Sequence, residues 1–208
     1  MVFNKSLHSG KSSVISALFR ILHISEGNII IDGVDISDIP QEILYTRLVC
    51  VTQTPYLIQG TVRENVDPFG TSSDEQVNQV LKEVTLWDTV VARGGIEVQL
   101  SDELFSVGQK QLLCLARAML RPGSILLLDE VSSSVDLHTN KLMQSIIRKH
   151  FATRTVITIA HQIFTILDAD RVAVISNGEI VEEGQPTELF ERDPPGPFRI
   201  LAAANMKL

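Results

Sequence analysis

Apolar positions along the chain change repeatedly between helical spacing and short continuous runs. Residues Ser12–Ile24 carry an apolar stripe at helical spacing, which predicts a helix. Apolar or β-branched runs predict strands at Met1–Asn4, Gly27–Asp32, Leu48–Thr52, Ile125–Leu128 and Thr155–Ala160. Further helices are predicted at Pro40–Arg47, Asp74–Val84, Gly108–Leu120 and Lys141–His150.

The last forty residues carry turn signals. Arg171–Ser176 and Glu179–Glu183 flank Asn177–Gly178, a pair that favours a type I′ turn and so predicts a β-hairpin. The run Asp193–Pro197 breaks the chain before a short final helix.

This order of elements predicts an α/β fold with a largely parallel sheet, because strands and helices alternate. Residues 60–120 alternate between polar segments and segments with helical apolar spacing. This pattern predicts a helical subdomain inserted into a core formed by residues 1–59 and 121–208. We therefore expect one domain over residues 1–208.

Composition narrows the function classes. The 208 residues fit one domain, and a net charge of −7 argues against nucleic acid as a partner, since phosphate backbones require a basic face. Cys50 and Cys114 lie in apolar runs without metal-ligand spacing, as reduced core cysteines do. No apolar run approaches the roughly 20 residues that span a bilayer, so the chain alone is expected to be soluble.

A candidate phosphate-binding loop lies at His8–Ser13, between a predicted strand and a predicted helix. In such loops the backbone N–H groups hold phosphates, the lysine reaches the β- and γ-phosphates, and the next hydroxyl ligates Mg²⁺. The full pattern requires glycine at position 5, where this chain has Lys5. Taken alone, the segment is equally well a helix cap followed by a surface lysine.

Two other segments could complete such a site. The strand at Ile125–Leu128 ends in Asp129 and Glu130, where one carboxylate could hold Mg²⁺ and the next could polarise a water molecule. Acidic residues also end many strands simply because they face solvent. Phe105–Gln109 precedes a helix, where serine and glycine form either an anion site or an ordinary N-cap.

Taken in order, these segments resemble the ATP-binding-cassette (ABC) ATPase family. Gly10–Ser12 resembles the end of Walker A, and Gln53 stands at the position of the Q-loop glutamine. Phe105–Gln109 resembles the LSGGQ signature and Ile125–Glu130 resembles Walker B. The remaining elements of the family order are similar to the D-loop, at Ser134–Asp136, and the H-loop, at Ala160–His161.

The sequence is most similar to the second ATPase domain of subfamily C, the multidrug-resistance-associated exporters. Residues 62–69 (VRENVDPF) and the segment IIRKHFATRTVITIAH carry this similarity. The resemblance implies a P-loop NTPase (RecA-like) core with an inserted ABC helical subdomain and with the N-terminal antiparallel strands missing. It also implies a face-to-face partner ATPase domain, membrane-spanning exporter domains, and a place at the cytoplasmic face of a membrane.

The resemblance assigns a role to each motif residue. Binding of ATP is implied for Ser9, Gly10, Lys11, Ser12 and Ser13. Ser12, Gln53 and Asp129 would organise Mg²⁺. Glu130 would be the general base, with His161 at the γ-phosphate and Gln53 completing the catalytic set. Contacts to the ATP of the opposing domain are implied for Ser106, Gly108, Gln109 and Asp136.

The chain departs from the family pattern at its start and before the signature. Lys5 and His8 replace Walker A glycines. In the family an aromatic residue upstream of this loop stacks on adenine, and we expect it to be missing here. Leu100–Phe105 replaces a glycine-rich approach to the signature. We interpret Met1–Leu7 as a wrongly predicted start or a remnant of a larger gene.

Three alternatives to a transporter ATPase follow from these departures and from the family. One is a degenerate module that binds ATP weakly and does not hydrolyse it. Another is an ABC ATPase that acts in translation or DNA repair. The negative net charge and the subfamily C motifs argue against this second alternative. The third is the inactive product of a pseudogene.

Replacing Lys5 and His8 together by glycine is expected to strengthen ATP binding more than either single change. Side chains resist the backbone conformation of the loop, whereas the charge of Lys5 at the surface attracts a triphosphate only weakly. Calorimetric titration of the wild type and the three variants with Mg-ATP at two salt concentrations measures this. A double variant that binds no better than the wild type would identify Lys5 as a phosphate contact.

Overall fold

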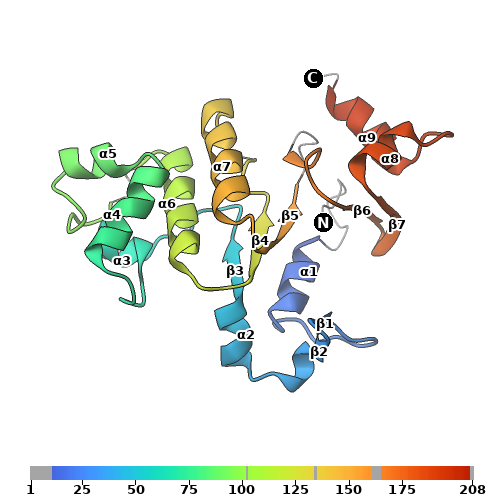
Figure 1. The fold of residues 1–208 in the computed structure, drawn as a ribbon, viewed down its shortest axis with the longest axis horizontal. Helices are drawn as coiled ribbons and strands as arrows, with labels where there is room; N and C mark the ends of the chain where they lie inside the picture. Colours follow the sequence, from blue (N-terminus) through green and yellow to red (C-terminus); the bar gives the residue numbers. More distant parts are fainter. Residues whose placement is uncertain (1–10, 102, 134, 161–164, 207–208) are drawn as a thin grey trace. The chain divides into compact units, whose positions relative to one another are not determined.

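The computed structural model describes residues 11–101, 103–133, 135–160 and 165–206 (Figure 1). Its helices are α1 (Lys11–Leu18), the 3₁₀ helix η1 (Ile36–Asp38), α2 (Gln41–Arg47), α3 (Val62–Val66), α4 (Asp74–Glu83), α5 (Trp87–Ala92), α6 (Val107–Leu120), α7 (Leu137–His150), α8 (Pro186–Glu191) and α9 (Pro197–Met206). Its strands are β1 (Ile30–Ile31), β2 (Val34–Asp35), β3 (Leu48–Val51), β4 (Ile125–Asp129), β5 (Thr155–Ile159), β6 (Val172–Ser176) and β7 (Glu179–Gly184). Within these residues no helix is long and apolar enough to cross a bilayer. The predicted strand Met1–Asn4 lies outside them.

The described chain contains a parallel sheet in the order β3-β4-β5 and two hairpins, β1-β2 and β6-β7. The α/β class predicted from the alternation of elements is therefore confirmed. The chain groups into two compact units. The first contains residues 1–48, 127–130 and 156–208, and the second contains 49–126 and 131–155. The predicted helical subdomain at 60–120 falls within the second unit, and its boundaries stay a prediction.

Strand β6 is the centre of the first unit because both of its faces are buried. Val172 and Val174 pack with Leu189 of α8 and Phe198 of α9. The alternate residues, Ala173 and Ile175, pack on the other side with Ile159 and with Val14 and Ile15 of α1. Each side chain of this size contributes about 1.5–3 kcal/mol when it is buried. Because successive side chains of the strand point to opposite faces, α8 and α9 pack on one face of β6 and α1 packs on the other (Figure 1).

Helix α1 ends at Leu18, six residues before the predicted end. Arg20 has a φ of 54°, the left-handed conformation that glycine usually supplies at the end of a helix. Two hydrogen bonds close a Schellman motif around it, from Arg20 N–H to Ala17 O and from Ile21 N–H to Ser16 O. The Arg20 guanidinium also donates to the carbonyls of Ile36 and Ile39. These tertiary hydrogen bonds hold a conformation that the local apolar stripe did not indicate.

Both hairpins turn on two residues with positive φ. The β6-β7 turn uses Asn177 (φ 52°) and Gly178 (φ 83°), which confirms the predicted Asn-Gly turn. Asp32 (φ 51°) and Gly33 (φ 81°) form the corresponding turn between β1 and β2. The strand predicted over Gly27–Asp32 pairs only at Ile30 and Ile31, because the turn begins immediately after them.

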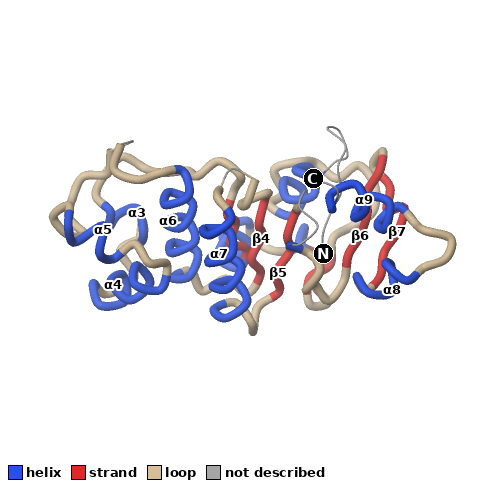
Figure 2. Tube along the Cα trace, turned by 90° about the horizontal axis from the view of Figure 1, so that it is seen from above, coloured by secondary structure: helices blue, strands red, loops and turns tan. Residues whose placement is uncertain are grey.

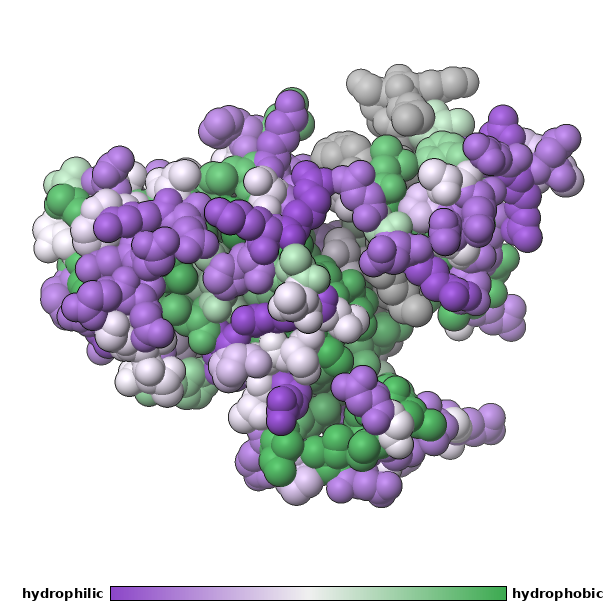
Figure 3. Space-filling view, in the orientation of Figure 1, coloured by the Kyte–Doolittle hydropathy of each residue, from purple (hydrophilic) through white to green (hydrophobic). Residues whose placement is uncertain are grey.

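Apolar side chains are exposed in the part of the first unit that carries α1, β1, β2 and α2. Figure 3 shows apolar surface over this segment, in the lower part of the view. The exposed residues there include Ile21, Leu22, Ile30, Val34 and Ile43, each 45–69% exposed. A contiguous apolar surface of this kind is unusual on a monomer.

Helix α6 is the core of the second unit, where it packs against α3, α4 and α7 (Figure 2). Its buried residues are Gly108, Gln111, Leu112, Leu113, Cys114, Leu115, Ala116, Ala118 and Met119. Arg117 of the same helix donates to the carbonyls of Asn65 and Tyr56. Asn65, which is fully buried, donates to the carbonyls of Ile58 and Thr61 and accepts from the Ile58 N–H. The loop before α3 is therefore tied to α6 by satisfied buried polar groups.

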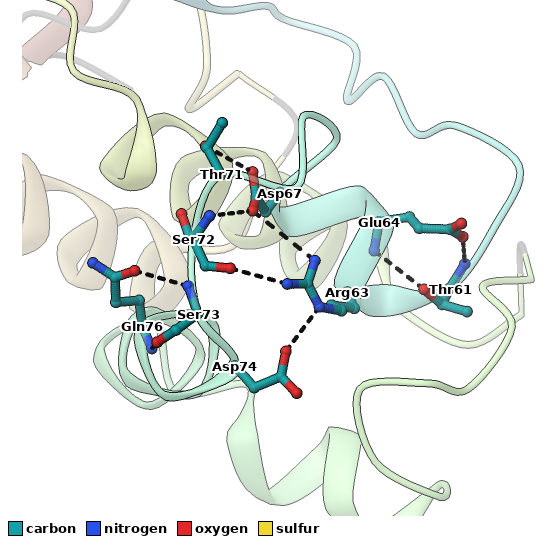
Figure 4. A network of polar contacts seen from close by, with 9 residues as sticks. All are labelled: Thr61, Arg63, Glu64, Asp67, Thr71, Ser72, Ser73, Asp74 and Gln76. Carbon is teal, nitrogen blue, oxygen red and sulfur yellow. Dashed lines mark hydrogen bonds and ion pairs between the residues drawn. The ribbon is translucent and has the colours of Figure 1, made fainter.

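The turn from α3 to α4 is organised by Arg63 (Figure 4). Its guanidinium donates to the Asp74 carboxylate at 2.8 Å and to the Ser72 carbonyl at 2.9 Å. Burial by itself raises the pKa of the neighbouring Asp67 carboxyl, but hydrogen bonds from Ser72 and Thr71 and the charge of Arg63 outweigh it and hold that pKa below its ordinary value. Asp67 therefore stays ionised inside the turn.

A buried carboxylate holds the C-terminal helix against the β6-β7 hairpin. The Glu182 side chain is fully buried; it accepts from the Phe198 N–H at 2.6 Å and from Arg192 at 3.0 Å. A Cβ atom on Gly196 would lie 2.0 Å from a carboxylate oxygen of Glu182, so a side chain there would displace the carboxylate. Its neighbour Glu183 instead pairs with Arg171 at the surface.

Replacing Glu182 by alanine is expected to destabilise the fold by about 1–3 kcal/mol, because the buried Phe198 N–H loses its acceptor. Glu183→Ala is the matched control: it removes a carboxylate from the next residue, but from an exposed ion pair worth less than about 1 kcal/mol. Urea unfolding of both variants measures the difference. Equal destabilisation by the two changes would contradict this account of the C-terminal helix.

Candidate functional site

Asp129 and Glu130 lie where the buried strand β4 ends. Residues 125–128 of the strand are buried, whereas both carboxylates are partly exposed. Glu130 has a φ of 49°, a left-handed conformation that is uncommon for residues with side chains. Its N–H donates to the Ile159 carbonyl at 2.9 Å, at the end of β5. The backbone thus stops the strand at the glutamate and fixes it to the strand that leads toward His161.

The phosphate-loop residues lie at the start of α1. The helix begins at Lys11 and includes Ser12 and Ser13, of which Ser13 is exposed. The first residues of a helix present unpaired N–H groups and the positive end of the helix dipole, which attract anions. Ser9, Gly10 and His161 lie outside the described residues, so their predicted roles stay predictions.

The side chain of Gln53 links two loops of the second unit. It follows β3 and is exposed, and its amide nitrogen donates to the Ser133 hydroxyl at 3.2 Å. Because the nitrogen end of the amide is engaged by Ser133, the oxygen end is the one suited to a cation. Among the described residues, no cluster of three or more His, Cys, Asp or Glu side chains offers a metal site by itself.

The segment Ser106–Gln109 forms a capping box at the start of α6. The Ser106 hydroxyl accepts from the Gln109 N–H at 3.2 Å, and the Gln109 side chain accepts from the Ser106 N–H at 3.0 Å. The N-cap interpretation of this segment is therefore confirmed. A hydroxyl that accepts a hydrogen bond still has its own hydrogen to donate, so capping leaves Ser106 able to bind an anion.

Asp136 caps α7, which begins four residues earlier than predicted because of this cap. Its carboxylate accepts from the backbone N–H groups of His138 and Thr139 and from the Thr139 hydroxyl at 2.6 Å. The same threonine packs against α6: a Cβ atom on Gly108 would lie 3.2 Å from its methyl carbon and 3.3 Å from its hydroxyl oxygen. Glycine at position 108 thus lets the start of α6 approach α7 closely.

The second unit brings Gln53, Asp136 and the segment Ser106–Gln109 into one set of contacts. Sequence reasoning missed Ser133 and Thr139, which make these contacts, and Gln111, whose amide nitrogen donates to the Thr52 carbonyl at 2.8 Å. Thr139 carried no capping signal, because the capping-box pattern has Glu or Gln three positions after the N-cap. Gln111 carried a weak signal, as an amide in an otherwise apolar helical stripe.

The sequence of this chain matches a known protein family. The model of the ABC transporter family matches residues 8–133, which include the phosphate-loop, Gln53, signature and Walker B segments. The chain belongs to the ABC transporter family. It is therefore a nucleotide-binding module of that family, and the resemblance drawn from its motifs is confirmed.

Similar proteins include transporters of much greater length. The chain is 43% identical over 200 residues to ABC multidrug transporter B of Aspergillus fumigatus, covering 96% of this chain and 14% of that protein. It is 46% identical over 200 residues to human ATP-binding cassette sub-family C member 2, covering 93% and 13%. A bacterial Atm1-family ABC exporter solved with ATP bound superposes with a TM-score of 0.90 at 29% identity, over 99% of this chain and 36% of that one. The chain thus spans about a seventh of the length of the curated relatives it matches.

Replacing Asp136 by asparagine is expected to remove a pH-dependent contribution to stability. The Thr139 hydroxyl and then the Thr139 N–H lower the pKa of the Asp136 carboxyl in the folded chain. A lowered folded pKa stabilises the fold above the ordinary aspartate pKa of about 4, and this stabilisation disappears as the pH falls through the folded value. Urea unfolding between pH 7 and pH 3 should therefore show a gap between wild type and variant that narrows with acid.

The matched control for this variant is Asp88→Asn, which changes an exposed carboxylate in the first turn of α5. That helix has no side-chain cap, so the same amide replacement removes no capping hydrogen bond. The Asp88→Asn curve should run parallel to the wild type. A constant gap for Asp136→Asn across the pH range would mean that the cap does not depend on ionisation.

Proposed function

We propose that this chain binds and hydrolyses ATP for an ABC exporter of subfamily C, as the second of its two ATPase domains. The observation that carries the proposal is the end of β4, where a buried strand presents Asp129 and Glu130 in a chain that belongs to the ABC family. Catalysis of phosphoryl transfer depends mostly on positioning and on neutralising charge. A rigid strand end supplies the positioning.

The triphosphate would bind at the start of α1. Ser9, Gly10, Lys11, Ser12 and Ser13 would surround the phosphates with backbone N–H groups and with the Lys11 ammonium. The support for this is that Lys11, Ser12 and Ser13 belong to the first turn of α1 that the structure describes, and the N-terminal end of a helix is its positive end. The unusual Lys5 and His8 belong to the same loop.

The chemistry of the donor atoms fits Mg²⁺. This ion prefers hard oxygen ligands and is held through one or two carboxylates, waters and substrate phosphates. A carboxylate from Asp129, a hydroxyl from Ser12 and the amide oxygen of Gln53 supply that chemistry, and the hydrogen bond from Gln53 to Ser133 leaves the oxygen end of the amide for the ion. When bound, Mg²⁺ would neutralise charge that develops on the phosphate oxygens.

Glu130 would act as the general base. Its carboxylate would accept a proton from the water that attacks the γ-phosphate, and His161 would contact that phosphate. The hydrogen bond from the Glu130 N–H to the Ile159 carbonyl supports this assignment. It fixes the backbone of the base to the strand that precedes His161.

The remaining motif residues would serve a second ATPase domain. Ser106, Gly108 and Gln109 would contact the ATP of that domain in a face-to-face dimer, and Asp136 would couple the two sites. The cap at the start of α6 supports this, because it fixes the serine hydroxyl next to unpaired N–H groups. Membrane-spanning domains would provide the transport path, which places the module at the cytoplasmic face of a membrane.

Replacing Glu130 by glutamine is expected to lower ATP turnover by about 10²–10⁴-fold, the contribution of a positioned general base. ATP affinity should stay within about twofold, because the amide keeps the shape of the carboxylate. Phosphate release and calorimetry on the same preparations measure the two quantities. The control is Glu179→Gln, which changes an exposed carboxylate at the first residue of β7.

Turnover that survives in Glu130→Gln would assign the base to another residue. ATP binding by the wild type without any turnover, when the partner ATPase domain is also present, would instead favour the degenerate module. The two results are distinguishable because binding and phosphate release are measured separately.

A further inference from the structure

Gln111 is a buried amide in the middle of the apolar helix α6. It is 1% exposed and lies among leucines and alanines that are equally buried. An amide loses its hydrogen bonds to water when it is buried, so it is costly in a core unless it finds partners. A hydrophobic residue of similar size would avoid this cost. The position of Gln111 therefore calls for an explanation in terms of what its amide contacts.

The nitrogen of this amide donates to the carbonyl of Thr52 at 2.8 Å. Thr52 is the residue directly before Gln53, and its hydroxyl donates in turn to the Thr54 carbonyl at 2.7 Å. The backbone on both sides of Gln53 is thus held, on one side by the body of α6 and across the turn by Thr52 itself. Gln53 is the side chain to which a role at Mg²⁺ is assigned above.

The opposite end of the Gln111 amide makes no hydrogen bond within the described residues. Its oxygen is buried and lacks a partner there. Stability alone does not account for such a group, because an unsatisfied buried acceptor destabilises a fold. The donor end, which holds Thr52, is the part of the side chain that has a clear use.

The contacts of Gln111 close a ring through the second unit. From Thr52 the chain passes to Gln53, which donates to Ser133. Ser133 lies three residues before Asp136, whose carboxylate accepts from the Thr139 hydroxyl. Thr139 packs on Gly108, one helical turn before Gln111 on α6. Three segments far apart in the sequence, around residues 53, 106–109 and 136, are thereby fixed to one helix.

We propose that Gln111 is a positioning residue that holds Gln53 in place for its contact with Mg²⁺ and makes it move together with the signature segment at the start of α6. The inference rests on the proposed function, since it assigns Gln111 a role through Gln53. Gln111 itself would touch neither nucleotide nor metal.

The test replaces Gln111 by methionine, which keeps the length and the apolar packing of the side chain but removes the donor. The ratio of ATP affinities with Mg²⁺ and with EDTA is measured by calorimetry. We expect this ratio to fall about two- to tenfold, the range that one hydrogen bond represents in an equilibrium constant, while the affinity in EDTA stays unchanged. In a Gln53→Ala background, Gln111→Met should cause no further fall.

Asn78→Leu is the matched control. Asn78 lies on α4 of the same unit, outside the three segments, and also has a buried amide oxygen without a partner in the described part of the chain. Asn78→Leu should leave the affinity ratio unchanged. A Gln111→Met variant that keeps the wild-type ratio, or that lowers it equally in the Gln53→Ala background, would overturn the proposal.

Hydrogen exchange of the nucleotide-free chain separates this inference from the proposed function. Gln111→Met should speed exchange at the amides of residues 53–58 and Asn78→Leu should not. Unchanged exchange in Gln111→Met refutes the positioning role even if ATP binds normally. Suppose instead that exchange is faster in Gln111→Met but the wild type shows no Mg²⁺-dependent ATP binding. That result supports the link between Gln111 and Gln53 and overturns the magnesium role of the site.

Discussion

The burial of α6 is the constraint on which the second unit depends. A helix buried on most sides must be surrounded, and α3, α4 and α7 all pack on it. Its polar side chains then have to find partners inside the unit. Arg117 and Gln111 find them in backbone carbonyls of the loop that follows β3. The hydrophobic effect thus places the helix, and hydrogen bonds from the same helix shape the loop that carries Gln53.

Many of the side chains proposed to bind or hydrolyse ATP also stabilise the local fold. Ser106 and Gln109 cap α6, Asp136 caps α7, and Gln53 joins two loops. Such contacts restrict the rotamers of these side chains before any ligand arrives, which reduces the entropy lost on binding. Glu130 is held in another way, by a backbone hydrogen bond and a left-handed φ at the end of β4. Preorganised groups of this kind are what phosphoryl transfer requires.

Local sequence signals were sufficient where the physical cause is local. The Asn177–Gly178 turn, the strand at Ile125–Leu128 and the α/β class were predicted and confirmed, because turn chemistry and apolar periodicity act over a few residues. The early start of α7 could also have been read from Asp136 and its capping pattern. The end of α1 could not, since Arg20 is held in its left-handed conformation by carbonyls of residues 36 and 39.

The sequence by itself determined the family and the identity of the motif residues, because the order of short motifs survives without knowledge of the fold. Only the tertiary structure decided how those motifs are held. The hydrogen bond from Gln111 to Thr52 spans 59 positions and that from Gln53 to Ser133 spans 80. The packing of Thr139 on Gly108 is likewise fixed by the approach of two helices. No periodicity or propensity encodes such pairs, because they form only when packing of the core brings distant segments together.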